Sequence, residues 1–364
     1  LSAVADCSTL MGGKMLCRLF YKALFLLLFC RKSVFLVFLN FLLNTLARQK
    51  QIYSYFCAMS YFSVTILGCG SATPTLRHMP SAQLVRYRQQ AMLVDCGEGA
   101  QLQLRRYGCS FAKISHIFIS HLHGDHFLGL PGLLSTMALH DVQGTVTVHT
   151  FTEGAGLLKN ILDILCRERP YKLQFDIIDP ANPGTVYSDA NLEVVAFPLS
   201  HRVPCVGYLF REKPKKRHID GESARFYGVP HYAMERLREG ADFTLPDGRV
   251  IPNERLTTPA DPAMSYAYCS DTTFSPRVAE AVKGVDVVYH EATYGDDQAH
   301  KARPRGHSTA RQAGQVAAMA GASKLVIGHY SQTVHDTSVL VGEASEVFGG
   351  EVIAADEGME ITLI

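Results

Sequence analysis

Four side chains that could bind a metal ion lie within six residues of the sequence, in the stretch His121-Leu122-His123-Gly124-Asp125-His126. Imidazole nitrogens and a carboxylate in this mixture suit Zn²⁺, and iron or manganese would also fit. A single histidine is more often a surface residue or a hydrogen-bonded core residue than a ligand. Four metal-capable groups directly after the apolar run 116–120 (HIFIS) therefore predict a metal site at the end of a strand.

Three more candidate ligands stand in comparable positions. His201 follows the apolar run LEVVAFPLS, Asp271 follows SYAYCS, and His329 follows KLVIG. Because each comes just after a predicted strand, we expect several strand ends to gather their side chains over one site. Two metal ions held there could activate water as a nucleophile and stabilise the oxygens of an in-line phosphoryl displacement. The metal site predicts a hydrolase without identifying its substrate.

The elements that must position these side chains follow one another along residues 59–364. Apolar runs of period two, bounded by turn residues, predict strands at about 61–67, 91–95, 116–120, 144–149, 192–198, 205–210, 265–269, 285–290, 324–328 and 359–364. Helical patterns fall near 98–107, 126–140, 154–168, 308–320 and 338–347. Helices interspersed among many strands predict a layered α/β sandwich.

The length of 364 residues suits one large domain with an appendage, or two modest domains. The whole chain has 35 basic and 34 acidic residues, but residues 1–58 hold seven basic residues and one acid. Subtraction leaves 28 basic against 33 acidic residues in 59–364, a net charge of −5. A nucleic-acid partner therefore cannot be argued from overall charge, and any basic surface must be local.

Residues 1–58 form a strongly apolar extension. Arg31 and Lys32 divide its apolar part into two runs, each shorter than the ~20 residues that a membrane span needs. A membrane anchor is one interpretation. The favoured interpretation is that the stretch is not native protein, because the chain opens on Leu1 and Met59 directly precedes the first strand of a self-contained catalytic domain, residues 59–364.

Cysteine usage bears on the compartment. The ten cysteines are scattered and show no C-x-x-C spacing, which is unlike a zinc finger or a disulfide scaffold. Single cysteines in a domain of this size are usually buried small hydrophobic residues in a reducing compartment. We therefore predict a cytoplasmic protein.

Residues 211–259 interrupt the alternation of strands and helices. They are polar and rich in proline and glycine, with one short helix-like piece at 231–239, and they read as an insertion that projects from the core. Five of the first seven residues of this basic arm are positively charged: Arg211, Lys213, Lys215, Lys216 and Arg217. Such a local cluster suits a phosphate backbone, although most basic loops are simply solvated.

The motifs resemble the metallo-β-lactamase superfamily, whose signature is H-x-H-x-D-H with downstream His, Asp and His. The resemblance spans residues 61–364 and includes Asp95 in LVDCGEG, which matches the structural Asp of the family. It implies an αββα sandwich with two Zn²⁺ ions per chain. By this resemblance one metal is held by His121, His123 and His201, the other by Asp125, His126 and His329, and Asp271 bridges them.

Two further motifs resemble the ribonuclease Z family, short form: His290-Glu291-Ala292-Thr293-Tyr294 after a predicted strand, and Gly306-His307-Ser308-Thr309 before a predicted helix that Ser308 could cap. The resemblance implies an endoribonuclease that removes the 3′ trailer from precursor tRNA and leaves a 3′-hydroxyl. Glu291 would orient His307, the general acid for the departing 3′-oxygen, while Asp125 acts on the side of the nucleophile. Otherwise Glu291 is a solvated charge and His307 is incidental.

The same resemblance implies a homodimer and an arm that grips the tRNA. We expect Lys213, Lys215, Lys216, Arg217 and Ser331 to bind substrate. Three departures from the family pattern concern RNA binding: Gly228-Val229-Pro230 replaces a Gly-Pro pair, Pro74-Thr75-Leu76-Arg77-His78 replaces Pro-x-Lys-x-Arg-Asn, and Tyr330-Ser331-Gln332-Thr333 lacks a final Arg. A superfamily phosphodiesterase or arylsulfatase-like hydrolase of small esters, and a non-catalytic RNA-binding or membrane-tethered module, are the alternatives.

Overall fold

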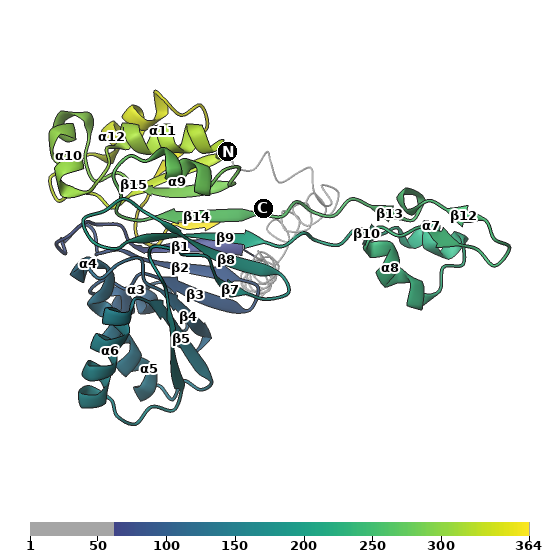
Figure 1. Ribbon diagram of the computed structural model, residues 1–364, viewed down its shortest axis with the longest axis horizontal. Helices are drawn as coiled ribbons and strands as arrows, with labels where there is room; N and C mark the ends of the chain where they lie inside the picture. The colour runs from purple at the N-terminus through teal and green to yellow at the C-terminus, as the bar shows by residue number, and fades with distance from the viewer. Residues whose placement is uncertain (1–61, 364) are drawn as a thin grey trace, which may run out of the picture. The chain divides into compact units, whose positions relative to one another are not determined.

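The computed structural model describes residues 62–363, within a compact unit of Tyr61–Ile364, and holds two seven-stranded sheets (Figure 1). Predictions about residues 1–58 lie outside the described residues. The first sheet has the order β18-β1-β2-β3-β4-β5-β6. Its strands are β1 (Phe62–Gly68), β2 (Ala82–Tyr87), β3 (Gln90–Val94), β4 (Ile114–Phe118), β5 (Thr145–Thr150), β6 (Lys172–Ile177) and β18 (Glu360–Thr362).

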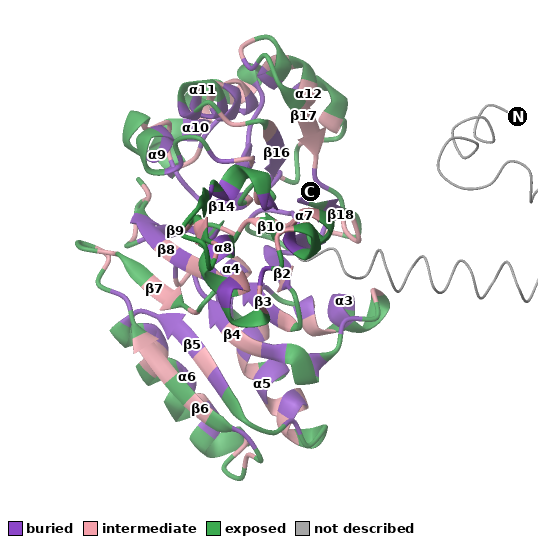
Figure 2. Cartoon of the chain, turned by 90° about the vertical axis from the view of Figure 1, so that its right-hand side faces the viewer, coloured by how far each residue is buried: buried purple, intermediate pink, exposed green. Residues whose placement is uncertain are grey.

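The second sheet has the order β17-β16-β15-β14-β9-β8-β7. Its strands are β7 (Thr185–Ser188), β8 (Leu192–Pro198), β9 (Val206–Glu212), β14 (Ser265–Cys269), β15 (Val287–Glu291), β16 (Lys324–Gly328) and β17 (Glu351–Ala354). Figure 2 shows β8 and β16 of this sheet largely buried. The sheets are mixed, because β14 to β17 run parallel while β7, β8 and β9 pair antiparallel.

Helices cover the outer faces of both sheets (Figure 1). Beside the first sheet lie α3 (Ala100–Arg106), α4 (Gly124–Phe127), α5 (Gly129–Leu139) and α6 (Thr152–Leu165). Beside the second lie α9 (Pro276–Ala281), α10 (Ala299–Arg305), α11 (Ala310–Ala320) and α12 (Thr337–Ser345). The predicted αββα architecture is confirmed. Among the described residues, no helix is long and apolar enough to cross a membrane.

Strand β3 shows why the inner strands read as continuous apolar runs. Met92 and Val94 belong to the hydrophobic core shared with the second sheet, whereas Ala91 and Leu93 belong to the core beneath α3, α5 and α6. Successive side chains of a strand point to opposite faces, and both faces of this sheet are covered. Burial on both sides therefore requires an apolar residue at every position of the strand.

The strand ends explain where the candidate ligands gather. Strands β3, β4, β5 and β6 are parallel, as are β14, β15 and β16. The carboxyl ends of parallel strands meet at one edge of a sheet, where α/β proteins place their sites. Asp95 follows β3, His121 lies three residues beyond β4, Asp271 lies two residues beyond β14, and His329 follows β16.

The insertion is a small lobe with a core of its own. Because β9 extends to Glu212 and β14 begins at Ser265, the insertion spans 213–264 rather than the predicted 211–259. It contains β10 (His218–Ile219), α7 (Gly221–Phe226), α8 (Met234–Arg238), β11 (Phe243–Thr244), β12 (Val250–Ile251) and β13 (Thr257–Thr258). Its core is formed by Ala224, Val229, Ala233, Leu237, Ile251 and Leu256. The helix predicted at 231–239 is present as a 3₁₀ turn followed by α8.

Candidate metal centre

All seven predicted metal ligands lie together at the carboxyl ends of the strands. The chain leaves β4 through Ser120 and reaches His121, then His123 at the start of α4. Two candidate metal-binding groups result: His121, His123, His201 and Asp271 form one, and Asp125, His126 and His329 form the other. These are the two sets that the sequence resemblance implied.

The first group has the spacing of a tetrahedral site. His123 Nδ1 lies 3.0 Å from His121 Nε2 and 3.3 Å from His201 Nε2. Asp271 Oδ2 lies 3.6 Å from His121 Nε2 and 3.9 Å from His201 Nε2. Zinc–nitrogen bonds of about 2.0–2.1 Å in a tetrahedron separate neighbouring ligand atoms by roughly 3.3–3.4 Å. The four donors therefore fit around one cation.

The second group shares Asp271 with the first. His126 Nε2 and His329 Nε2 lie 3.2 Å apart, and each is 3.5 Å from Asp125 Oδ2. Asp271 Oδ1 lies 3.3 Å from His126 Nε2 and 3.1 Å from His329 Nε2, and this buried oxygen has no hydrogen-bond partner among the residues that the structure describes. One carboxylate oxygen thus faces each group, which is the arrangement that a bridging ligand requires.

Oxygen atoms behind the imidazoles fix the direction of their lone pairs. Four histidines face the centre through Nε2 and are held at Nδ1: His121 by Ser120 Oγ at 3.0 Å, His126 by Asp95 Oδ2 at 2.7 Å, His201 by the Gly306 carbonyl at 2.8 Å, and His329 by Thr293 Oγ1 at 3.0 Å. An Nδ1–H directed at oxygen leaves the lone pair of Nε2 aimed at the centre, as in metal-binding histidines. Lone pairs that face one another are stabilised by a cation between them. The donor set therefore fits metal ions.

Burial keeps the first group of imidazoles neutral. It is the largest influence on the pKa of His121, which lies well below its usual value, and burial also lowers the pKa of His201. A neutral imidazole is the form that binds a metal.

Asp95 supports the centre without belonging to either ligand group. This fully buried carboxylate accepts hydrogen bonds from the Ser120 N–H at 2.7 Å, the Ser120 hydroxyl at 2.8 Å and the Tyr268 hydroxyl at 2.7 Å, besides its contact with His126. The backbone of Asp95 has a φ of 54°, in the left-handed region that a residue with a Cβ seldom adopts. Its hydrogen bonds hold a strained turn at the end of β3.

Glu291 and His307 form a second functional pair beside the ligands. His307 Nδ1 lies 3.0 Å from Glu291 Oε1, which also accepts a hydrogen bond from the Thr272 N–H at 2.9 Å. Burial lowers the pKa of His307, but the neighbouring Glu291, with Asp271 and Asp125, outweighs this and raises it to about 9. Glu291 is completely buried and contacts His307 directly, so the solvated-charge interpretation of Glu291 is wrong.

The loop that carries His307 differs in one detail from the prediction. The N-cap of α11 is Thr309, whose hydroxyl accepts from the Gln312 N–H in a capping box, and not Ser308. The Ser308 hydroxyl instead donates to the Thr272 carbonyl at 2.7 Å. This bond ties the loop of His307 to the segment that follows Asp271.

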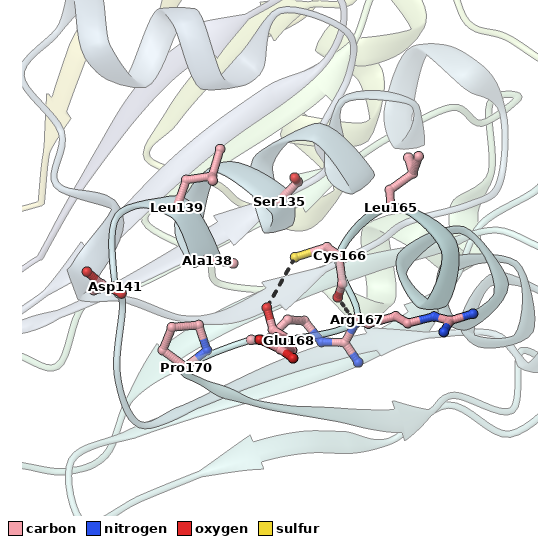
Figure 3. A pocket seen from close by; sticks show the side chains of 10 residues that line it. Ser135, Ala138, Leu139, Asp141, Leu165, Cys166, Arg167, Glu168 and Pro170 are labelled. Atoms are coloured by element: carbon pink, nitrogen blue, oxygen red, sulfur yellow. Dashed lines mark hydrogen bonds between the residues drawn. The ribbon is translucent and has the colours of Figure 1, made fainter.

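Two cavities adjoin the centre and share His307. One, of about 410 Å³, is lined by residues that include His123, Asp125 and Asp271. The other, of about 290 Å³, is lined by residues that include Ser331, Gln332 and Tyr294. A larger cavity of about 830 Å³ near the ends of α5 and α6 is lined by none of the predicted site residues (Figure 3). The centre and its two cavities are therefore the candidate active site.

The basic residues of the arm are not brought to this centre. Each of the four predicted contacts has a local partner: Lys213 donates to the Asp189 carbonyl, Lys215 pairs with Glu212 at 2.8 Å, Lys216 pairs with Glu239 at 2.9 Å and with Glu235, and Arg217 donates to Thr257 Oγ1 at 2.7 Å. Ser331, in contrast, lines the smaller cavity.

Sequence reasoning missed two arginines that line the cavities. Arg202 lines both, and Arg305 lines the smaller one, where its guanidinium donates to the Tyr294 hydroxyl at 2.9 Å. Their positions in the sequence could have indicated that they lie near the site, because Arg202 directly follows a predicted ligand and Arg305 lies two residues before His307. Both can contact a phosphate group that enters the site.

Two sheets between layers of helices, with a His and Asp cluster at their carboxyl edge, define a metal-dependent hydrolase of the metallo-β-lactamase fold. Solved structures share this fold. The human tRNase Z, short form, is 24% identical with a TM-score of 0.60, and covers 83% of this chain and 100% of its own. A metallo-β-lactamase fold protein from Bacillus subtilis is 19% identical with a TM-score of 0.58, and covers 82% of this chain and 98% of its own.

Sequence relatives narrow the class. Proteins named ribonuclease Z from Parabacteroides distasonis and from Porphyromonas gingivalis are each 46% identical over 305 residues, covering 84% of this chain and 100% of the relative. The family model described as Anti-Pycsar protein Apyc1 matches residues 62–154, less than half of the chain. The chain belongs to the ribonuclease Z family, which confirms the resemblance read from its motifs, and it is a metal-dependent nuclease.

Proposed function

We propose that this member of the ribonuclease Z family is an endoribonuclease with two Zn²⁺ ions that removes the 3′ trailer from precursor tRNA and leaves a 3′-hydroxyl on the tRNA. The observation that carries the proposal is the contact between Glu291 and His307 beside the seven ligands, because it adds an oriented acid to a metal centre. The names of the sequence relatives and of the human structural neighbour agree with this substrate class.

The chain's own residues divide the work around the scissile phosphate. Bound zinc would activate water and neutralise charge that develops on the phosphoryl oxygens. Asp125 accepts a hydrogen bond from the Ala72 N–H at 2.7 Å through Oδ2, which leaves Oδ1 available to accept a proton from the nucleophile. Arg202, at the wall shared by the two cavities, can hold the phosphate in place.

His307 supplies the proton to the departing oxygen. Its Nδ1 is turned toward Glu291, so Nε2 is the nitrogen that can donate. Burial lowers the pKa of His307, but Glu291 above all raises it to about 9. The ring is therefore protonated at neutral pH. A 3′-oxygen leaves more readily when it is protonated as its bond to phosphorus breaks.

The proposal is tested by incubating the purified protein with a 3′-extended precursor tRNA and mapping the cut. We expect one cut at the 3′ end of the tRNA body, and its loss with a chelator. His307→Ala should slow cleavage by about 10²–10⁴-fold while both metals remain bound. The control is His300→Ala, an exposed histidine on α10. Cleavage by His307→Ala at the wild-type rate would refute the assignment of the acid.

Deletion of the arm separates this proposal from a phosphodiesterase that acts on small esters. The arm has its own core and joins the domain through β9 and β14. Replacing 213–264 by a short glycine-rich turn should abolish cleavage of precursor tRNA and leave hydrolysis of a small phosphodiester. Equal loss of both activities, with the metals retained, would count against the arm as the RNA-binding element.

The remaining parts of the proposal concern assembly and location. A homodimer in the cytoplasm is the arrangement that the family resemblance implies. Sedimentation of the purified protein tests the dimer, since a single monomeric species at micromolar concentration would contradict it. Fractionation of cells that express the full chain tests the location.

A further inference from the structure

A second cluster of metal-capable side chains lies apart from the centre. Cys69 follows β1, His78 lies in the loop between β1 and β2, and Glu357 lies in the turn between β17 and β18. The thiol is completely buried, and the other two side chains are about nine-tenths buried. None of the three belongs to the ligand groups of the catalytic centre.

The donor atoms of these three side chains lie close enough to bind one ion. Cys69 Sγ lies 3.4 Å from His78 Nδ1 and 3.7 Å from Glu357 Oε1, and His78 Nδ1 lies 3.0 Å from the other carboxylate oxygen, Glu357 Oε2. Zinc bonds of about 2.3 Å to sulfur and about 2.0–2.2 Å to nitrogen and oxygen place tetrahedral neighbours roughly 3.3–3.6 Å apart. The Ala355 carbonyl oxygen, 3.6 Å from Sγ, offers a fourth position.

We propose that Cys69, His78 and Glu357 form a third metal site, for a structural zinc ion, separate from the catalytic centre. A thiolate, a carboxylate and a neutral imidazole carry two negative charges together, which balance a divalent cation in a buried place. Sulfur, nitrogen and oxygen donors in this combination favour zinc over magnesium or calcium. Burial raises the pKa of the Cys69 thiol, so binding of the ion displaces a proton.

The site would fasten the loop that reaches the active site. Glu357 Oε1 accepts a hydrogen bond from the Met79 N–H at 2.8 Å, at one end of this loop. At the other end, the Ala72 N–H donates to the ligand Asp125. His78 itself lies in this loop, so an ion held by His78 and Glu357 would tie the loop to the turn between β17 and β18.

Cobalt substitution tests the proposal directly. The catalytic centre offers only nitrogen and oxygen donors, so a thiolate-to-cobalt charge-transfer band in the near ultraviolet can come only from a cysteine. We expect the fully Co²⁺-loaded full chain to show this band and Cys69→Ser to lose it. The matched control is Cys109→Ser, another buried cysteine, whose sulfur accepts a hydrogen bond from Arg86 at 2.9 Å and which should leave the band unchanged.

Zinc analysis gives a second measure. The wild-type chain should hold one more zinc equivalent than Cys69→Ser. If the serine variant fails to fold, His78→Asn takes its place and should likewise hold one zinc equivalent less than the wild-type chain. Absence of the band from the loaded wild-type chain, or its survival in Cys69→Ser, overturns the proposal and leaves a hydrogen-bonded cluster. Cleavage of precursor tRNA tests the catalytic proposal separately, because it does not depend on the charge-transfer band.

Discussion

Replacing Glu291 by glutamine should shift the pH dependence of cleavage. The side chain keeps its size and can still accept the hydrogen bond from the Thr272 N–H, but it loses its charge. The pKa of His307 is about 9 against an ordinary 6.5. That difference corresponds to roughly 3 kcal/mol, which is the stabilisation of the imidazolium by Glu291 and the more distant Asp271 and Asp125, net of the opposing effect of burial.

Glu291→Gln should lower the rate of cleavage at neutral and basic pH, because His307 must be protonated to act as the general acid. A raised pKa keeps His307 protonated, and therefore active, until the pH passes about 9. Without the charge of Glu291, burial is the main influence left and lowers the pKa. If the pKa falls to about 6.5 or below, no more than about a tenth of the molecules carry the proton at pH 7.5. We therefore expect at least a tenfold loss of rate at that pH and recovery in more acidic solution.

Single-turnover cleavage of a precursor tRNA, measured from about pH 5.5 to about pH 9.5, displays the shift as a basic limb that moves to lower pH. Single turnover removes product release from the observed rate. The control is Glu280→Gln, an exposed residue of α9 that should leave the profile unchanged. A basic limb of Glu291→Gln that coincides with the wild-type limb would show that Glu291 does not tune the acid.

Three other predictions concern support of the centre, packing and substrate binding. Asp95→Ala leaves the hydrogen-bond donors that converge on this carboxylate without an acceptor. Zinc affinity, measured by competition with a chelator, should fall by about 10–100-fold. An unchanged zinc affinity would contradict the supporting role of Asp95. Gly207→Ala places a Cβ against the ring of Phe197 and should lower the free energy of unfolding by about 1–3 kcal/mol in urea. Gly156→Ala, in an open position on α6, should not lower it. Arg202→Ala should raise the KM for precursor tRNA and leave bound zinc unchanged, and an unaltered KM would exclude a phosphate contact there.

The metal centre was predictable because its ligands follow buried strands. An apolar run such as KLVIG predicts both a buried strand and the position at which the chain leaves the core. His329 lies at that position. Parallel strands then bring residues that are distant in sequence to one edge. The pairing of His307 with Glu291 could be inferred only through the family resemblance, since it joins two separate loops.

Strand β2 was not predicted because the partner of its buried polar residue lies in the other sheet and cannot be recognised from the sequence. Its sequence AQLVRY places Gln83 in the core, where the side chain is almost completely buried and accepts a hydrogen bond from the Tyr266 hydroxyl of the second sheet. The sequence alone presents a polar residue in a short segment. Edge strands β6, β7 and β17 were also missed, because their half-exposed residues lack the apolar run of a central strand.

The basic arm shows a different limit of sequence reasoning. Lys216 appeared as part of a free positive cluster, but its partners Glu235 and Glu239 lie 19 and 23 residues further along the chain. The fold of the insertion brings them together at α8, which contains Glu235 and is followed directly by Glu239. Exposed pairs of this kind are weak because water screens them, so phosphates can still compete for the lysine.

The attachment of the arm makes the enzyme modular. Its two ends leave the domain on neighbouring antiparallel strands, where Arg211 of β9 pairs with Ser265 of β14. The cost of closing a flexible loop rises by only about 0.6 kcal/mol for each doubling of its length. An insert of any length whose ends meet at this spacing can therefore be grafted here while His201, before β9, and Asp271, after β14, keep their places. Recognition of new RNAs can evolve, or be engineered, by exchange of one segment without rebuilding the catalytic centre.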